Sequence, residues 1–218
     1  MSPINRTLTN PFGIQASASQ YLSGSYLSPK RFSSIGWQLN LSLELDADRY
    51  LDVGSGNSIL AYLLRKQDKS VFSIDHNLGS IPDVQAIFPY LPFCAGVVDA
   101  CLCFQVLEHL PYSLVREGLA ELARVSKKYI VISLPDQTEE LSGRQRFARR
   151  VYQTFRFPLR WKPPSRQPDP EHFWEIGMDG ILPEDIIRIA QMCQLTVKKN
   201  FRNPLFVYHH FFVFEKLR

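Results

Sequence analysis

Short apolar runs alternate with amphipathic stretches over most of the chain. Runs of four to eight apolar residues, bounded by glycine, proline or polar residues, are typical of strands. We expect strands over residues 49–53, 70–74, 83–87, 98–104, 128–135, 195–201 and 207–214. The run 98–104 is apolar except for Asp99, which is typical of a parallel strand covered on both faces.

Between these runs, apolar residues recur every three or four positions and predict helices. One helix begins at Ser28-Pro29, where a serine cap precedes a first-turn proline, and continues through Leu43. Other helices are expected over residues 57–66, over 114–125 and after Pro183. Few residues separate the second strand from the third, so the crossover between them is one turn or absent. The alternation indicates an α/β fold with a doubly wound, mostly parallel sheet.

An insertion over residues 143–170 interrupts this alternation. Eight basic residues and no acidic residue lie within 144–166. The rest of the chain has 17 basic against 21 acidic residues, so the insertion carries the whole positive balance. Phe147, Val151 and Phe155 are spaced at i, i+4 and i+8, which predicts a basic amphipathic helix. Such a helix is typical of a substrate lid, of a peripheral membrane contact through 144–166, or of a solvated helix packed on the sheet.

Length and composition agree with a single domain that carries an insertion. The 218 residues are 45% hydrophobic, which is enough for a sizeable core. No apolar run approaches the ~18 residues that span a bilayer. Residues 1–20 lack the apolar segment of a secretory signal, so we expect a cytoplasmic protein. Residues 1–27 are rich in serine, asparagine and glycine, and we expect them to be mobile or ordered by a ligand.

The four cysteines contain no C-x-x-C pair, so we predict core thiols and no metal site. Cys101 and Cys103 are two positions apart in an expected strand and therefore share one of its faces.

Residues 50–57 read Y-L-D-V-G-S-G-N, a short strand that ends in a glycine turn. Nineteen positions after Gly56, the next strand ends in Asp75. Such a turn lets the backbone approach a ligand closely, and an acid at the end of the next strand can bind a ribose diol. A dinucleotide would require glycine where Ile59 stands, and the lysine of a phosphate-binding loop is missing. The pattern therefore indicates a nucleoside cofactor without phosphates.

Four segments, in order, carry a resemblance to a known family. Residues 52–58 match an acidic-x-G-x-G-x-G motif, with Ser58 in place of the third glycine. L-P-F at 91–93, V-D-A at 98–100 and Q-V-L-E-H-L at 105–110 follow, and then the apolar strand at 128–135. Over residues 48–136 the chain resembles the class I S-adenosylmethionine-dependent methyltransferases, in particular the ubiquinone/menaquinone-biosynthesis-like (methyltransferase type 11) group.

This resemblance implies a Rossmann-like sheet of the seven-strand type with an antiparallel last strand. It also implies S-adenosylmethionine as cofactor and S-adenosylhomocysteine as product. By resemblance, Asp52 contacts the amino-acid end of the cofactor and Asp75 the ribose. The family usually has an acidic residue before L-P-F that meets the adenine amino group, but residues 87–90 offer none, so adenine relies on backbone groups and apolar packing. The expected cofactor-binding residues are Asp52, Gly54, Gly56, Asp75, His76, Ile87, Phe88 and Gln105.

Methyl transfer from a sulfonium is an in-line displacement that requires alignment more than a catalytic side chain. A base helps when the acceptor is a hydroxyl or an acidic carbon, and histidine has a suitable pKa. His109, after the strand 98–104, and His172, in E-H-F-W-E-I-G, are the catalytic candidates. The alternatives are a loop-fixing residue for His109 and an aromatic-cluster residue for His172. For His209 and His210, inside the last strand, we favour structural roles.

We therefore expect a methyltransferase that acts on a small-molecule, lipid-linked or glycan acceptor. A binding protein that has lost the chemistry is the alternative. An RNA methyltransferase is disfavoured, because no RNA-binding module accompanies the arginine cluster. The expected organisation is an N-terminal extension and helix (1–47), a cofactor-binding core (48–136), a basic aromatic insertion with a helix (137–180), and a C-terminal helix and strands that complete the sheet (181–218).

Overall fold

The computed structural model describes residues 28–147, 151–158 and 169–217. Its main element is a seven-stranded sheet in the order β3-β2-β1-β4-β5-β9-β8. The first five strands along the chain run parallel, and β9 pairs antiparallel with both β5 and β8. The strands are β1 Arg49–Val53, β2 Ser70–Asp75, β3 Val84–Gln85, β4 Val98–Phe104, β5 Ser126–Pro135, β8 Leu195–Arg202 and β9 His209–Lys216. The predicted mostly parallel sheet with an antiparallel last strand is confirmed.

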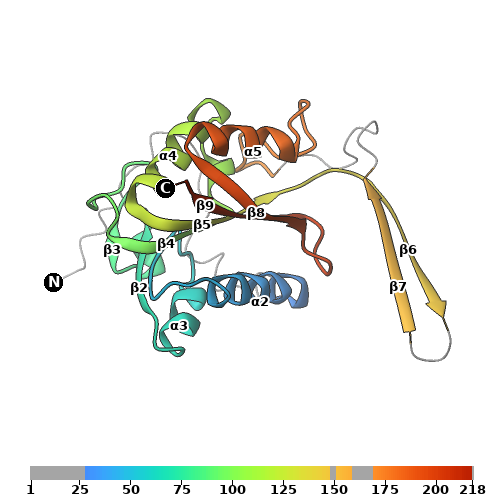
Figure 1. Cartoon of the computed structure of the whole chain (residues 1–218), viewed down its shortest axis with the longest axis horizontal. Helices are drawn as coiled ribbons and strands as arrows, with labels where there is room; N and C mark the ends of the chain where they lie inside the picture. Colours follow the sequence, from blue (N-terminus) through green and yellow to red (C-terminus); the bar gives the residue numbers. More distant parts are fainter. Residues whose placement is uncertain (1–27, 148–150, 159–168, 218) are drawn as a thin grey trace.

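Four α-helices in the described part of the chain cover the two faces of the sheet. They are α2 Pro29–Leu43, α3 Ile59–Arg65, α4 Val115–Val125 and α5 Pro183–Met192. Helices α2 and α3 lie on one face, and α4 and α5 lie on the other (Figure 1). Each pair closes its own apolar core, one around Leu41, Leu60 and Leu64 and one around Leu119 and Ile186. The sheet is therefore doubly wound, as predicted.

Local signals in the sequence account for several element boundaries. Helix α2 begins after Ser28, whose Oγ accepts a hydrogen bond from the N–H of Arg31 at 3.4 Å. Its C-terminal end is tied to β1 by the hydroxyl of Tyr50, which donates to the carbonyl oxygens of Ser42 and Ala47. Between β2 and β3 only the 3₁₀ turn η1, Leu78–Ser80, is present, so the shortened second crossover is confirmed.

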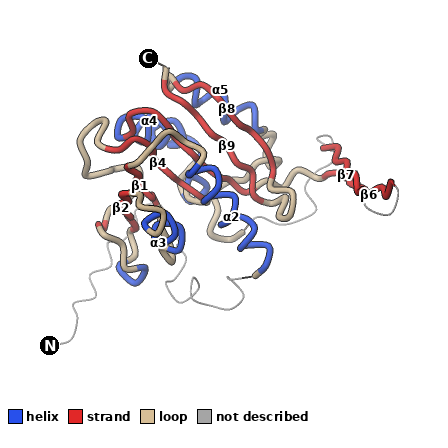
Figure 2. The backbone as a smooth tube through the Cα atoms, turned by 60° about the horizontal axis from the view of Figure 1, so that its bottom comes forward, coloured by secondary structure: helices blue, strands red, loops and turns tan. Residues whose placement is uncertain are grey.

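The predicted helical insertion after β5 is wrong. Strands β6, Glu140–Phe147, and β7, Val151–Pro158, pair antiparallel as a hairpin, with Phe147 opposite Val151. The sequence V-Y-Q-T-F-R-F of 151–157 explains this, because β-branched and aromatic residues lose side-chain freedom in a helix and favour strands. The hairpin forms its own sheet and extends away from the body of the molecule (Figure 2).

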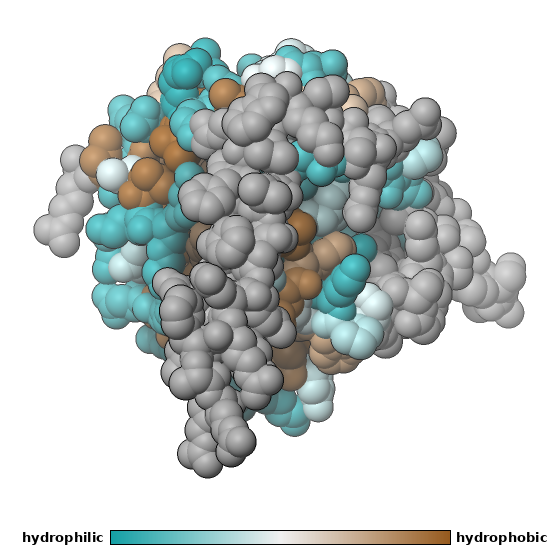
Figure 3. All heavy atoms as spheres, turned by 90° about the vertical axis from the view of Figure 1, so that its right-hand side faces the viewer, coloured by the Kyte–Doolittle hydropathy of each residue, from teal (hydrophilic) through white to brown (hydrophobic). Residues whose placement is uncertain are grey.

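Other expectations fall partly or wholly outside the described residues. These are the mobile segment 1–27 and the parts of the basic stretch at 148–150 and 159–166. Within the described residues, no helix combines the length and apolarity required to cross a bilayer. On the side of the molecule from which the hairpin extends, hydrophilic and hydrophobic residues are interspersed on the described surface (Figure 3).

The four cysteines lie in three different environments, with Cys193 half-buried against the core. Cys101 and Cys103 are buried in the core, as predicted, and burial raises the pKa of both thiols. The prediction is wrong for Cys94, which is exposed because it lies in the loop before β4.

His209 makes the stability of the fold depend on pH. The residue is 1% exposed, neither ring nitrogen has a hydrogen-bond partner among the described residues, and burial lowers its pKa to about 3. The unfolded chain takes up a proton near pH 6.5, whereas the folded chain does not until far lower pH, so stability falls as the pH drops below 6.5. We expect wild type to lose about 2 kcal/mol more than His209→Phe between pH 7.5 and pH 5. Urea unfolding at the two pH values measures this difference, and equal losses in both proteins would contradict it.

Candidate functional site

The glycine turn after β1 lies at the carboxyl edge of the sheet and is clamped to β2. The N–H groups of Gly54 and Ser55 both donate to the carbonyl oxygen of Ile74, at 2.8 and 3.0 Å. Gly54 has a φ of +69°, and a Cβ built on it would lie 2.4 Å from Cγ2 of Val106. Only glycine fits here without displacing the loop after β4, and the backbone is left open to a ligand.

Ser58 stands where the family motif has its third glycine, and its backbone explains the preference for glycine there. The residue adopts the left-handed conformation, with φ +55°, immediately before α3. Its side chain makes no capping hydrogen bond to the helix. The turn therefore keeps its shape without the third glycine, at a cost of roughly 1 kcal/mol in backbone strain.

The carboxylate of Asp75 is buried and held in a fixed orientation at the end of β2. Its Oδ2 accepts from the N–H of Gly56 at 3.0 Å and its Oδ1 from the N–H of Asn77 at 2.9 Å. The ring of His76 lies beside it, with Nδ1 3.1 Å from Oδ1. Each carboxylate oxygen has a second lone pair, so Asp75 can also accept hydrogen bonds from a diol.

A mainly apolar pocket adjoins Asp75. Of the described residues that line it, only Asp75 is acidic, in agreement with the missing acid before L-P-F. The predicted Ile87 and Phe88 line this pocket together with His76. The full lining is Val53, Gly54, Ile74, Asp75, His76, Ala86, Ile87, Phe88, Val106, His109 and Leu110.

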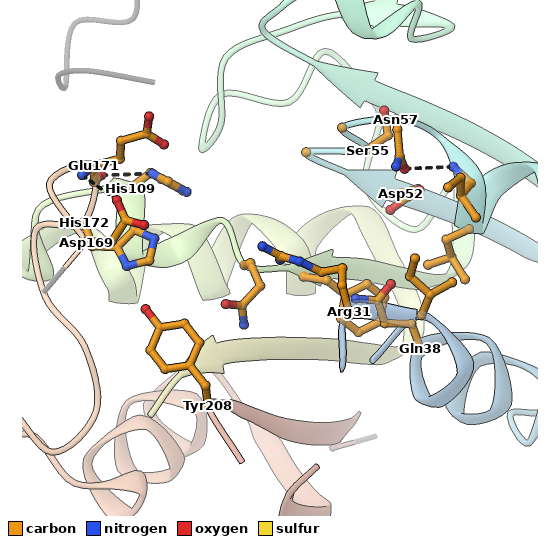
Figure 4. A pocket seen from close by; sticks show the side chains of 17 residues that line it. Arg31, Gln38, Asp52, Ser55, Asn57, His109, Asp169, Glu171, His172 and Tyr208 are labelled. Carbon is orange, nitrogen blue, oxygen red and sulfur yellow. Dashed lines mark hydrogen bonds between the residues drawn. The ribbon is translucent and has the colours of Figure 1, made fainter. Parts of the chain in front are cut away.

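A second pocket runs from the glycine turn across the end of β4 (Figure 4). It shares Gly54 and His109 with the first pocket, so the two are neighbours along one edge of the sheet. Asp52, Gly56 and Gln105 line it on the β1 and β4 side. Arg31 lines it from α2, and Asp169, Glu171, His172 and Tyr208 line its other end (Figure 4).

Two residues of this second pocket are unusual, Asp52 in its pKa and Gln105 in its backbone conformation. Asp52 is 4% exposed, and burial, reinforced by the negative charge of Asp75, raises its pKa to about 7. Gln105 has a φ of +57°, and its Nε2 donates to Oγ of Ser133 at 3.1 Å. Left-handed backbone at a non-glycine residue concentrates at functional sites.

The segment that contains His172 is docked onto the loop after β4. The N–H of Phe173 donates to the carbonyl oxygen of Glu108 at 2.9 Å, and Nε1 of Trp174 donates to that of Leu110 at 3.0 Å. The backbone of Ile176 pairs with Asp136 at the end of β5. These contacts bring His172 and His109 together, with ring centroids 4.9 Å apart in an edge-on arrangement.

The two histidines lie in opposite electrostatic environments. Burial and the neighbouring His172 lower the pKa of His109 to about 4, so its ring is neutral at physiological pH. Burial would also lower the pKa of His172, but its hydrogen bond to Glu175 and the charges of Glu108 and Glu175 outweigh burial and raise it. A neutral His109 has a lone pair that can accept a proton or bind a cation.

The structure thus gathers every predicted site residue along one edge of the sheet. All eight cofactor-binding candidates and both histidines line the two pockets. Sequence reasoning missed Arg31, Asp169, Glu171 and Tyr208 among the lining residues, and Glu108 and Glu175 behind them. Glu175 stands in the same E-H-F-W-E motif as His172, which was a usable signal. Arg31 and Tyr208 lie in no motif.

Comparisons with known proteins bear on this arrangement. Residues 51–132 match a family model described as a methyltransferase domain. No curated protein matches the sequence. Several solved structures share the fold.

One is a SAM dependent methyltransferase from Archaeoglobus fulgidus, 14% identical, with a TM-score of 0.64 over 92% of this chain and 100% of that chain. Another is the magnesium protoporphyrin IX methyltransferase from Synechocystis PCC 6803 with bound SAH, 14% identical, with a TM-score of 0.58 over 94% and 90%. A third is the 1,6-didemethyltoxoflavin-N1-methyltransferase from Burkholderia thailandensis, with bound 1,6-didemethyltoxoflavin and S-adenosylhomocysteine, 13% identical, with a TM-score of 0.55 over 94% and 93%. At these identities the likeness establishes the Rossmann-like fold.

Proposed function

We propose that the chain is a class I S-adenosylmethionine-dependent methyltransferase of the type 11 group and that it methylates a small-molecule acceptor in the second pocket. The observation that carries the proposal is the pair of neighbouring pockets that meet at Gly54 and His109. The first has the features of a nucleoside site, and the second is polar and lies beside it. Bound S-adenosylmethionine supplies a methyl group on a sulfonium, ready for in-line displacement.

The residues of the turn and of β2 fit the cofactor. The fixed carboxylate of Asp75 accepts the ribose hydroxyls, and His76, Ile87 and Phe88 enclose the adenine. The open backbone at Gly54 and Gly56 and the carboxylate of Asp52 bind the methionine part, with Gln105 opposite them. Because the adenine side offers no second acid, apolar packing contributes most of the binding there.

The acceptor lies in the half of the second pocket that His109, His172 and Tyr208 line. Two of the solved structures with this fold have small-molecule methyl acceptors in their names, 1,6-didemethyltoxoflavin and magnesium protoporphyrin IX. We therefore favour a small molecule over a lipid-linked or glycan acceptor. His109, neutral at physiological pH, faces this half and is available to the acceptor.

Cofactor affinity is expected to depend on the ionisation of Asp52. The cofactor amino group is cationic and favours the ionised carboxylate, so binding is strongest above the raised pKa of about 7 and weakens as the pH falls through it. We expect affinity for S-adenosylhomocysteine to fall about tenfold between pH 8 and pH 6. Calorimetric titration of Asp52→Asn should show a much flatter profile, and a parallel decline in both proteins would contradict this role.

The proposed function is tested by calorimetric titration of the whole chain with S-adenosylmethionine and S-adenosylhomocysteine. We expect both to bind at one site per chain. No binding would overturn the proposal. Incubation with methyl-labelled cofactor and a panel of small hydroxylated and aminated acceptors then separates an enzyme from a binding protein. Transfer to RNA in place of any small molecule would favour the alternative acceptor class.

A further inference from the structure

A cluster of three potential metal ligands lies at the acceptor end of the second pocket. One carboxylate oxygen of Glu108 and one ring nitrogen each of His109 and His172 all lie within 4.8 Å of one another. Ligand atoms bound to one transition-metal ion at 2.0–2.2 Å are separated by roughly 3–4.4 Å. The cluster therefore needs only a small contraction to hold an ion.

Glu108 is the first feature that favours an ion at this position. The side chain is 0% exposed, and neither carboxylate oxygen has a hydrogen-bond partner among the described residues. An ionised carboxylate that is buried without a partner costs several kcal/mol in a folded protein, so such a group is neutralised by a proton, paired with a cation or bound to a metal. The nearby N–H groups of Phe173 and Trp174 do not donate to this carboxylate. They donate to the backbone carbonyl oxygens of Glu108 and Leu110.

The histidines are fixed in a way that suits coordination. Nδ1 of His109 lies 3.0 Å from the backbone carbonyl oxygen of Glu171, and Nδ1 of His172 lies 2.7 Å from Oε1 of Glu175. Both partners are acceptors, so each ring carries a proton on Nδ1 and directs Nε2 away from that partner. Nε2 of the neutral His109 offers its lone pair directly, whereas His172, whose pKa is raised, releases its Nε2 proton to solvent when an ion binds. A metal-binding histidine commonly donates its other N–H to a carbonyl or carboxylate group in this manner.

Glu175 is in turn held in place. Its Oε1 accepts from the hydroxyl of Tyr208 at 2.8 Å and from the N–H of Asp169 at 3.2 Å. A chain of contacts thus runs from Tyr208 through Glu175 to His172. It has the arrangement of an outer shell around a metal site, in which a carboxylate orients the histidine ligand.

We propose that Glu108, His109 and His172 bind a divalent transition-metal ion at the acceptor end of the second pocket. Two imidazoles and one carboxylate suit zinc, manganese or iron(II), and calcium or magnesium much less. Three protein ligands leave coordination positions open.

The metal site also indicates the class of methyl acceptor, and this inference rests on the proposed function. His109 and His172 line the second pocket, so the open positions face the acceptor. The acceptor class is then an alcohol or phenol with a second oxygen donor beside the hydroxyl. A divalent ion held by the three residues would stabilise the negative oxygen that forms when the acceptor hydroxyl loses its proton to water. His109 and His172 then act as ligands, and no histidine base is required.

Metal binding is tested on the whole chain after treatment with a chelator. Calorimetric titration with ZnCl₂ and with MnCl₂, the latter also followed by the loss of the free Mn²⁺ paramagnetic signal, should show one site per chain. We expect Glu108→Gln and His172→Gln each to weaken it by 100-fold or more, and Glu175→Gln by 10 to 100-fold. Glu117→Gln, an exposed glutamate on α4, is the matched control and should bind the ion as wild type does.

Titration of the same preparations with S-adenosylhomocysteine keeps the two proposals apart. If wild type binds S-adenosylhomocysteine but no ion, the metal site is overturned and the methyltransferase proposal stands. If wild type binds the ion but not S-adenosylhomocysteine, the reverse holds. Ion binding that survives in both Glu108→Gln and His172→Gln would place the ion elsewhere and overturn the assignment. Circular dichroism shows whether each variant is folded, and the two independent ligand variants guard against the loss of one to misfolding.

Discussion

Replacement of Gly54 with alanine is expected to abolish the binding of S-adenosylhomocysteine. The new Cβ would lie 2.4 Å from Cγ2 of Val106, and the φ of +69° disfavours any side chain. Because Val106 packs against the core, the turn must move instead. Gly54 lines both pockets, so any shift of the turn distorts the whole cofactor site. We expect no detectable binding by calorimetry and a loss of about 2–4 kcal/mol of unfolding free energy, measured with urea.

The chain offers a matched control at Gly180, which has a φ of +78° but no atom within 4 Å of an added Cβ. Gly180→Ala therefore imposes the backbone strain without the clash, at a cost of about 1–2 kcal/mol. It should bind S-adenosylhomocysteine as wild type does. If Gly54→Ala also binds normally, the turn does not approach the cofactor as proposed.

Patterns confined to single elements made the fold predictable. The run 98–104 is apolar except for Asp99, and β4 spans those same residues because a parallel strand buries both faces. The Ser28-Pro29 cap located the start of α2. The helix predicted for the insertion is wrong because Phe147, Val151 and Phe155 fit a helical period by coincidence. The β-branched and aromatic residues of 151–157 favour a strand instead.

The candidate site was predictable only where the residues that form it lie in one sequence motif or at a fixed spacing from it. Asp75 was found from its spacing to the glycine turn, and it does contact Gly56. The acceptor half depends instead on tertiary contacts between distant segments, such as that of His109 with Glu171, 62 positions away. Neither the periodicity of the sequence nor the spacing of its motifs predicts such a contact. The missing partners of Glu108 likewise became visible only with the packing around it.

Replacement of Asp75 with asparagine is expected to weaken the binding of S-adenosylhomocysteine about 100-fold. The ribose diol would keep the amide oxygen as one acceptor but lose the second, and the loss of one hydrogen bond to a charged acceptor costs about 1.5–3 kcal/mol. The new amide group also cannot accept from the N–H groups of both Gly56 and Asn77, which the two carboxylate oxygens now do. Calorimetric titration measures the affinity, and urea unfolding measures how much of the change comes from a loosened turn.

Asp83 provides the comparison for this change, because its carboxylate accepts from the N–H and Oγ of Ser73 and pairs with Arg65 without lining either pocket. Asp83→Asn therefore disturbs a carboxylate that also holds β2 in place, and we expect it to lower stability with little effect on affinity. Equal affinity losses in Asp75→Asn and Asp83→Asn would mean that both act through the fold of β2, and the ribose would then have to bind elsewhere. A loss of affinity in Asp75→Asn alone would indicate that the end of β2 contacts the cofactor directly, because of these two carboxylates only that of Asp75 lines a pocket.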